Sequence, residues 1–135
     1  MNIPLTDFIL ICIAGGVGSM ARAGMGAVLT RAMHPAGAVF VINGLGSFLI
    51  GGALGVFLAT LAPFNAAQAP ASFTYFAIGL LGGFTTVSTF ALQVHELWHR
   101  GQARAALSAA LGSVLMCPLL AWLGLAVVGS VQGGG

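Results

Sequence analysis

The chain has 135 residues, of which 59% are hydrophobic and 4% are charged. Soluble domains carry about a quarter charged residues, so this composition predicts an integral membrane protein and excludes an ordinary soluble enzyme. The four basic side chains are all arginines and form no basic patch, which excludes nucleic acid as a partner.

Four apolar runs are long enough to cross a bilayer, because about 20 helical residues span about 30 Å of hydrocarbon. They cover residues 8–29, 38–61, 73–97 and 105–128. The first run is expected to be retained as a span, since Asp7 stands where a signal peptide would carry Lys or Arg. We therefore expect one all-α membrane domain over residues 1–135, with four transmembrane helices and a disordered tail at 129–135.

The first span is rich in small residues, which allow a neighbouring helix to approach closely. Its single charge is Arg22, which is expected near the far interface, where it could snorkel or pair with carbonyls, and which we interpret as a structural anchor. Residues 16–21 imitate a dinucleotide-binding fingerprint. That fingerprint needs an acidic residue about 20 positions later, and none occurs between Asp7 and Glu96, so nucleotide binding is excluded.

In the second span, small or polar residues recur every four positions and so share one helix face. They are Asn43, Ser47, Gly51 and Gly55. Asn43 has two open interpretations: its amide could hold helices together, or its NH₂ group could donate to a passing anion without a fixed charge that would trap the ion.

The third span contains paired glycines followed by four hydroxyl residues, within residues 79–90. This composition predicts a broken helix. Because hydrocarbon offers no water to free amides and carbonyls, a break at membrane depth must turn its backbone toward protein or an ion. The exposed backbone dipoles can hold an anion or a cation, so the break is the candidate ion site.

The end of the third span, from His95 to Glu96 to His99, matches the metalloprotease pattern of two histidines and a glutamate. A catalytic zinc needs a third protein ligand, and none follows His99. No enzyme activity is therefore expected, and a role for the two histidines stays open.

The fourth span contains Ser113, which has two open interpretations. Its hydroxyl could extend a polar track beside the break, or it could bond to the carbonyl one turn back, as serines in membrane helices often do.

Three segments together resemble the CrcB family, the Fluc fluoride channels. They are Gly-Gly-Phe-Thr-Thr-Val-Ser-Thr-Phe at 82–90, Asn-Gly-Leu-Gly-Ser-Phe at 43–48 with Gly51, and Gly-Gly-Val-Gly-Ser-Met-Ala-Arg at 15–22. The resemblance covers essentially the whole chain. It implies a channel in the inner membrane of a bacterium that lets cytoplasmic fluoride leave passively and so gives fluoride resistance.

The resemblance also implies an antiparallel, dual-topology homodimer with two fluoride pathways and a structural Na⁺ that is not transported. By motif, Gly82 and Thr85 would offer backbone oxygens to the sodium ion. Asn43 and Phe90 would line the fluoride route, with Ser113 and Thr86 on its polar wall.

Two features depart from the family pattern. Val87 stands where the family motif usually has phenylalanine, so the aromatic contribution falls on Phe90. Three arginines fall in loops on one side of the membrane, at 31, 100 and 104. By the positive-inside rule this favours an outside N-terminus, whereas dual topology predicts a near-balanced count.

Two alternatives belong to other classes. A small multidrug-type, proton-coupled exporter also has four spans, but it needs a carboxylate deep in the membrane, and Asp7 and Glu96 lie at span ends. The chain could also be a non-transporting membrane assembly subunit whose glycines only pack helices.

Overall fold

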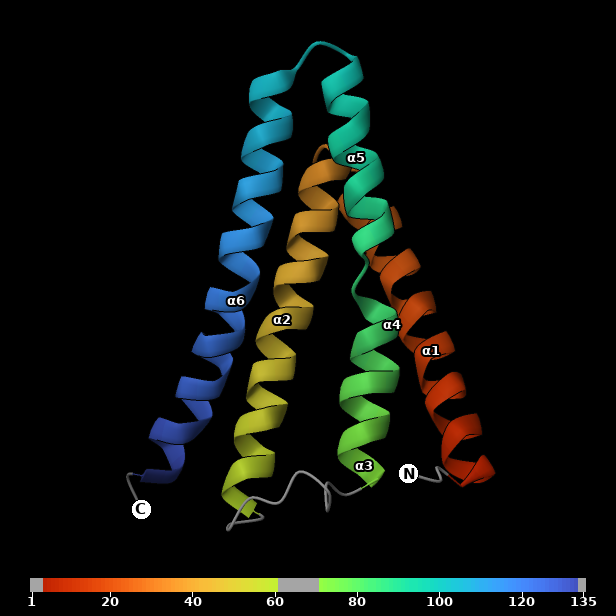
Figure 1. The fold of residues 1–135 in the computed structure, drawn as a ribbon, viewed down its shortest axis with the longest axis vertical. Coiled ribbons are helices and arrows are strands. Elements are labelled where there is room, and N and C mark those ends of the chain that lie inside the picture. The colour runs from red at the N-terminus through yellow and green to blue at the C-terminus, as the bar shows by residue number, and fades with distance from the viewer. Residues whose placement is uncertain (1–3, 61–70, 134–135) are drawn as a thin grey trace.

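The computed structural model describes residues 4–60 and 71–133, and over these residues it is helical, with no strand. The long helices are α1 (Leu5–Leu29), α2 (Pro35–Thr60), α5 (Val87–His99) and α6 (Ala103–Gly133). The segment before α5 consists of α3 (Ala71–Thr74), the π-helix η2 (Tyr75–Leu81) and α4 (Gly82–Phe84). In Figure 1 this segment and α5 follow one another as a single interrupted rod.

The four predicted spans are confirmed, and each extends further than expected at one end or both. The membrane-length apolar helices cover residues 5–29, 35–60, 72–99 and 103–131. Position 61, the expected end of the second span, lies outside the described residues. The expectation of a disordered tail at 129–135 is wrong for 129–133, which continue α6 as helix. Residues 134 and 135 lie outside the described part of the chain.

The turns between spans follow from local chemistry. After α1, the hydroxyl of Thr30 donates to the carbonyl of Gly26 at 2.8 Å, and Pro35 begins α2. Proline suits a first helical position because its missing N–H would have no partner there. Between α5 and α6, Gly101 has φ of 74°, a left-handed conformation that glycine adopts without steric cost. The chain can therefore reverse in a few residues.

Close backbone approach joins the helices in two pairs. A Cβ at Gly51 on α2 would collide with the backbone of Ala121 on α6. A Cβ at Gly124 on α6 would likewise collide with the carbonyl of Phe48 on α2. On α1, a Cβ at Gly18 would collide with the carbonyl of Leu80. Glycine is therefore required where α2 meets α6 and where α1 meets η2. Figure 1 shows α6 beside α2, and α1 beside α4.

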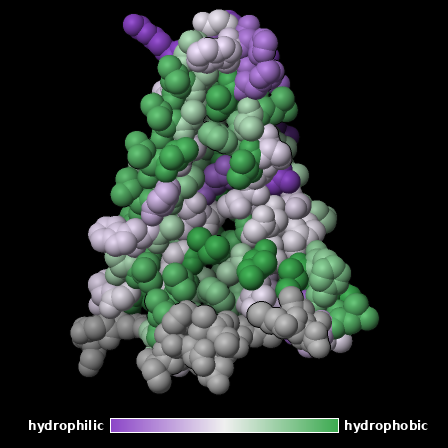
Figure 2. Space-filling view, viewed as in Figure 1, coloured by the Kyte–Doolittle hydropathy of each residue, from purple (hydrophilic) through white to green (hydrophobic). Residues whose placement is uncertain are grey.

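The surface is largely apolar, as expected for a protein in lipid. Large hydrophobic side chains are exposed along all four spans, including Phe8, Ile78, Val114 and Trp122. In Figure 2 hydrophobic residues cover much of the face seen, and hydrophilic residues gather at the end where α5 meets α6. This distribution fits a bundle that spans a bilayer.

Candidate ion site at the helix break

The third span is interrupted at Thr85 and Thr86, whose backbones are extended. Thr85 has φ −82° and ψ 158°, and Thr86 has φ −150° and ψ 124°. Both hydroxyls bond to the backbone of the helices on either side of the break. The Thr85 hydroxyl donates to the carbonyl of Leu81 at 3.2 Å, and the Thr86 hydroxyl accepts from the amide of Thr89 at 3.2 Å. Threonine therefore both ends α4 and caps α5.

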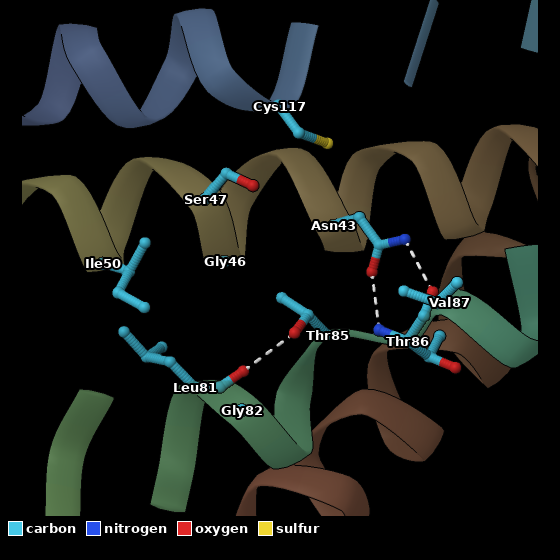
Figure 3. A pocket seen from close by; sticks show the side chains of 10 residues that line it. All are labelled: Asn43, Gly46, Ser47, Ile50, Leu81, Gly82, Thr85, Thr86, Val87 and Cys117. Atoms are coloured by element: carbon cyan, nitrogen blue, oxygen red, sulfur yellow. Dashed lines mark hydrogen bonds between the residues drawn. The ribbon is translucent and has the colours of Figure 1, made fainter. Parts of the chain in front are cut away.

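Asn43 on α2 holds the break through the backbone of Thr86. Its Nδ2 donates to the Thr86 carbonyl at 2.9 Å, and its Oδ1 accepts from the Thr86 amide at 2.8 Å. A carboxamide is the neutral side chain that can both donate and accept in this way, and the two bonds fix which end is nitrogen. Both bonds are drawn in Figure 3. The helix-joining role considered for Asn43 is therefore present, and the second Nδ2 hydrogen is left for another acceptor.

The carbonyl of Gly83, just before the break, receives two donors from α1. The hydroxyl of Ser19 donates to it at 3.2 Å, and Nε of Arg22 donates at 3.4 Å. The expected carbonyl partner of Arg22 is thus found. We expected Arg22 near the membrane interface. Instead, its side chain reaches the break within the third span. A positive charge therefore stands next to the released backbone.

Two carbonyls at the break lose their helical donors. The amide of Thr86 bonds to Asn43 and is withdrawn from the carbonyl of Gly82, four residues earlier. The carbonyl of Thr85 accepts no hydrogen bond from the described residues. Gly82 is exposed and Thr85 is half-buried. Because released carbonyls in an apolar environment need a partner, these two oxygens could bind a cation.

A cavity of about 290 Å³ opens beside the break, between α2, α4 and α6. Its polar lining comes from Asn43, Ser47, Gly82, Thr85 and Thr86, with the thiol-bearing Cys117 from α6. In Figure 3 these side chains surround one space, and Asn43 reaches across it to the break. The lining contains hydroxyls, an amide and backbone groups, and no charged side chain.

A second cavity, of about 220 Å³, lies on the α1 side of the break. Its polar lining includes Arg22, Thr30, Thr86, Thr89 and Gln93. Thr86 lines both cavities, so this residue and its Asn43 contact stand between them.

The residues predicted from sequence fall into two groups. Asn43, Gly82, Thr85 and Thr86 come together around the first cavity. Phe90 and Ser113 do not line it: Phe90 is half-buried on α5, one turn after Thr86, and Ser113 lies on α6, one turn before Cys117.

Ser113 is buried, with 9% of its surface exposed, and its hydroxyl makes no hydrogen bond with the described residues. Ser108 and Ser130 on the same helix do bond to carbonyls three residues back. Of its two interpretations, the bond to the preceding turn is therefore absent, and the hydroxyl is left available.

Sequence reasoning missed the roles of Ser19 and Cys117. Ser19 lies three residues before Arg22, but it was named only as part of the motif at residues 15–22, whereas Arg22 was interpreted as an anchor. Their shared helix face was the signal that could have joined them, since residues three apart on a helix are neighbours. Cys117 gave no such signal, because its place beside Asn43 depends on how α6 packs on α2.

The zinc-protease pattern finds no support in the structure. Within residues 4–60 and 71–133, no group of three or more His, Cys, Asp or Glu could hold a metal ion. The third ligand that a catalytic zinc requires is therefore missing from the described residues.

The profile of the family described as CrcB-like protein, camphor resistance (CrcB), matches residues 9–125. The chain belongs to the CrcB family. Among curated relatives, a fluoride-specific ion channel FluC of Thermus thermophilus is 34% identical over 129 residues, covering 93% of this chain and 98% of its own. FluC of Mesorhizobium japonicum is 37% identical over 122 residues, covering 88% and 93%. FluC 1 of Symbiobacterium thermophilum is 36% identical over 126 residues, covering 90% and 96%.

Proposed function

We propose that this CrcB-family chain is a fluoride-selective channel, which lets cytoplasmic fluoride leave the cell passively and so gives fluoride resistance. The observation that carries the proposal is the broken third span, held open at membrane depth by the two hydrogen bonds from Asn43. The full-length similarity to FluC proteins supports the choice of ion. We place the channel in the inner membrane of a bacterium, as a multi-pass protein that catalyses no reaction.

The donors at the break suit a small and strongly hydrated anion. A pore must replace the water of such an ion with several weak donors, while a free lysine or arginine would hold the ion too tightly. The first cavity has amide and hydroxyl groups and no charged lining residue. The nearby Arg22 already donates to the carbonyl of Gly83. The chain thus offers weak neutral donors where the ion would lose water.

We assign the fluoride route to Asn43, Thr86, Phe90 and Ser113. Asn43 keeps one free Nδ2 hydrogen, and Ser113 keeps an unbonded hydroxyl. Phe90 would contribute its ring edge, which carries the positive part of the aromatic quadrupole. Val87, at the other aromatic position of the motif, is 79% exposed and has no such edge.

We further propose that two copies assemble as an antiparallel homodimer with dual topology and two fluoride routes. A four-helix chain this small cannot enclose a wet path once its core is packed. Val87 and Ser88, directly after the break, are exposed in the single chain. A second copy would cover them. The one-sided arginines mean that the two orientations need not be equally frequent.

At the centre of that dimer we propose a structural Na⁺ that is not transported. Its ligands would be the backbone oxygens of Gly82 and Thr85, whose helical donors are missing. Oxygen is the ligand that a hard cation prefers, and two copies together would double the number available. The Na⁺ is then a stabilising ligand of the dimer.

The deciding experiment is ion efflux from liposomes that contain the purified protein, measured with a fluoride electrode and, in parallel vesicles, a chloride electrode. Fluoride efflux without chloride efflux supports the channel. Proton-coupled uptake of a cationic dye without fluoride efflux would instead indicate the small multidrug-type exporter. If a correctly folded protein shows neither kind of transport, the result would support the non-transporting membrane assembly subunit.

A further inference from the structure

The last turns of α5 carry a pair of exposed histidines that the ion site does not use. His95 and His99 are four residues apart, so they lie on one helix face. Their ring centroids are 4.3 Å apart, with an angle of 61° between the ring planes. Neither ring forms a hydrogen bond or an ion pair with the described residues. Their nitrogens are therefore free to bind a ligand.

We propose that His95 and His99 form a surface site for one divalent transition-metal ion of the kind that imidazole prefers, Cu²⁺, Ni²⁺ or Zn²⁺. One nitrogen from each ring would bind the metal. No third His, Cys, Asp or Glu among the described residues completes a cluster, so water fills the other positions. This is an open, reversible site, unlike the closed zinc site of a structural domain.

The helix supplies the geometry. Side chains four residues apart on a helix have Cβ atoms about 5–6 Å apart, and metal–nitrogen bonds are about 2.0–2.1 Å long. Two imidazoles already in contact can therefore share one ion after rotation of their side chains. Because the helix holds both ligands together, binding by the first raises the effective concentration of the second. Mg²⁺ and Ca²⁺ prefer oxygen and should not compete.

The third histidine of the chain provides a matched control. His34 is also exposed, but it has no histidine one turn away, and its Nδ1 accepts the amide of Ala36 at 3.2 Å. It should bind metal only as a single ligand. Its substitution therefore tests whether the pairing, rather than exposed histidine in general, makes the site.

The test is Ni²⁺ titration of the full chain without a polyhistidine tag, in detergent, by calorimetry. We expect one Ni²⁺ per chain, with affinity reduced about a hundredfold in His95→Ala and in His99→Ala, and unchanged in His34→Ala. Excess Mg²⁺ should leave the titration unchanged. Size-exclusion chromatography of each variant checks that it is folded.

A second measurement identifies the ligands directly. Electron paramagnetic resonance of bound Cu²⁺ should show coupling to two imidazole nitrogens in the wild-type chain and to one in His99→Ala. Equal Ni²⁺ affinity in wild type and both α5 variants, or coupling to a single nitrogen in the wild type, would overturn the paired site.

Discussion

At the residue scale, the break depends on one amide that donates and accepts at the same time. Asn43 bonds to both backbone groups of Thr86, the N-cap residue of α5, and is the acceptor for its amide. Leaving a buried donor or acceptor unsatisfied costs about 1–3 kcal/mol, so the amide stabilises a conformation that an apolar side chain could not. The same residue therefore has a structural role and a proposed conducting role.

Asn43→Asp separates these contributions. A carboxylate can still accept from the Thr86 amide, but it cannot donate to the Thr86 carbonyl, and it brings negative charge into an anion route. We expect fluoride efflux to be abolished in liposomes, while the dimer remains intact on a sizing column. Ser108→Ala is the control, because Ser108 lines neither cavity and its hydroxyl bonds to the carbonyl of Ala105 on its own helix. Normal efflux in a folded Asn43→Asp protein would remove Asn43 from the route.

Phe90→Ile tests the aromatic contribution. Isoleucine keeps apolar bulk but has no positive ring edge, so the rate of fluoride efflux should fall strongly, by about tenfold or more if the edge contributes about 1.4 kcal/mol. Val87→Phe should raise the rate or leave it unchanged. A Phe90→Ile protein that conducts like wild type would exclude the ring edge as a contact.

At the element scale, the third span is fixed by its neighbours on both sides. Gly83 illustrates this: a Cβ there would collide with the carbonyl of Gly15 on α1, whereas one at Gly82 would meet only the carbonyl of Ala77, at 3.9 Å. Sequence marks the two adjacent glycines equally. The structure distinguishes them. Gly83 is needed for the close packing of α1, whereas a Cβ at Gly82 would make no close contact within the chain.

Gly83→Ala should therefore destabilise the chain, by about 1–3 kcal/mol for an overpacked contact, as measured by the thermal midpoint in detergent. Gly16→Ala, on α1 where a Cβ would meet nothing within 4 Å, is the control. Equal midpoints for the two variants would show that α1 does not approach the break as closely as described.

Features that depend on local sequence could be predicted, whereas contacts between residues distant in the sequence could not. The four spans and the break were predictable, because apolar length, glycine pairs and hydroxyls act locally. The partner of Arg22 was not, since 61 residues separate it from Gly83 and only packing brings them together. The helical state of residues 129–133 was also missed, because glycine near a chain end favours disorder unless the helix before it continues.

At the scale of the whole molecule, the proposed sodium ion and dimer make one prediction. If the carbonyls of Gly82 and Thr85 hold Na⁺ between two copies, the dimer should resist heat and detergent better in Na⁺ than in a large organic cation at equal ionic strength. Thr85→Ser, which keeps the carbonyl and a hydroxyl, should retain that difference. Equal stability in both salts would remove sodium from the structure of the dimer.

The pairing of helices also has a consequence for how the chain is made. α1 packs on the segment before the break, and the bond from Ser19 to Gly83 spans 64 residues of sequence. At about 5–20 residues per second, a ribosome needs about 3–13 s to synthesise that interval. During this time the glycine face of α1 lacks the third span on which it finally packs. In the same way, α2 is synthesised before α6, its main neighbour. The first two spans must therefore be stable in lipid as single helices, which their high content of apolar side chains allows.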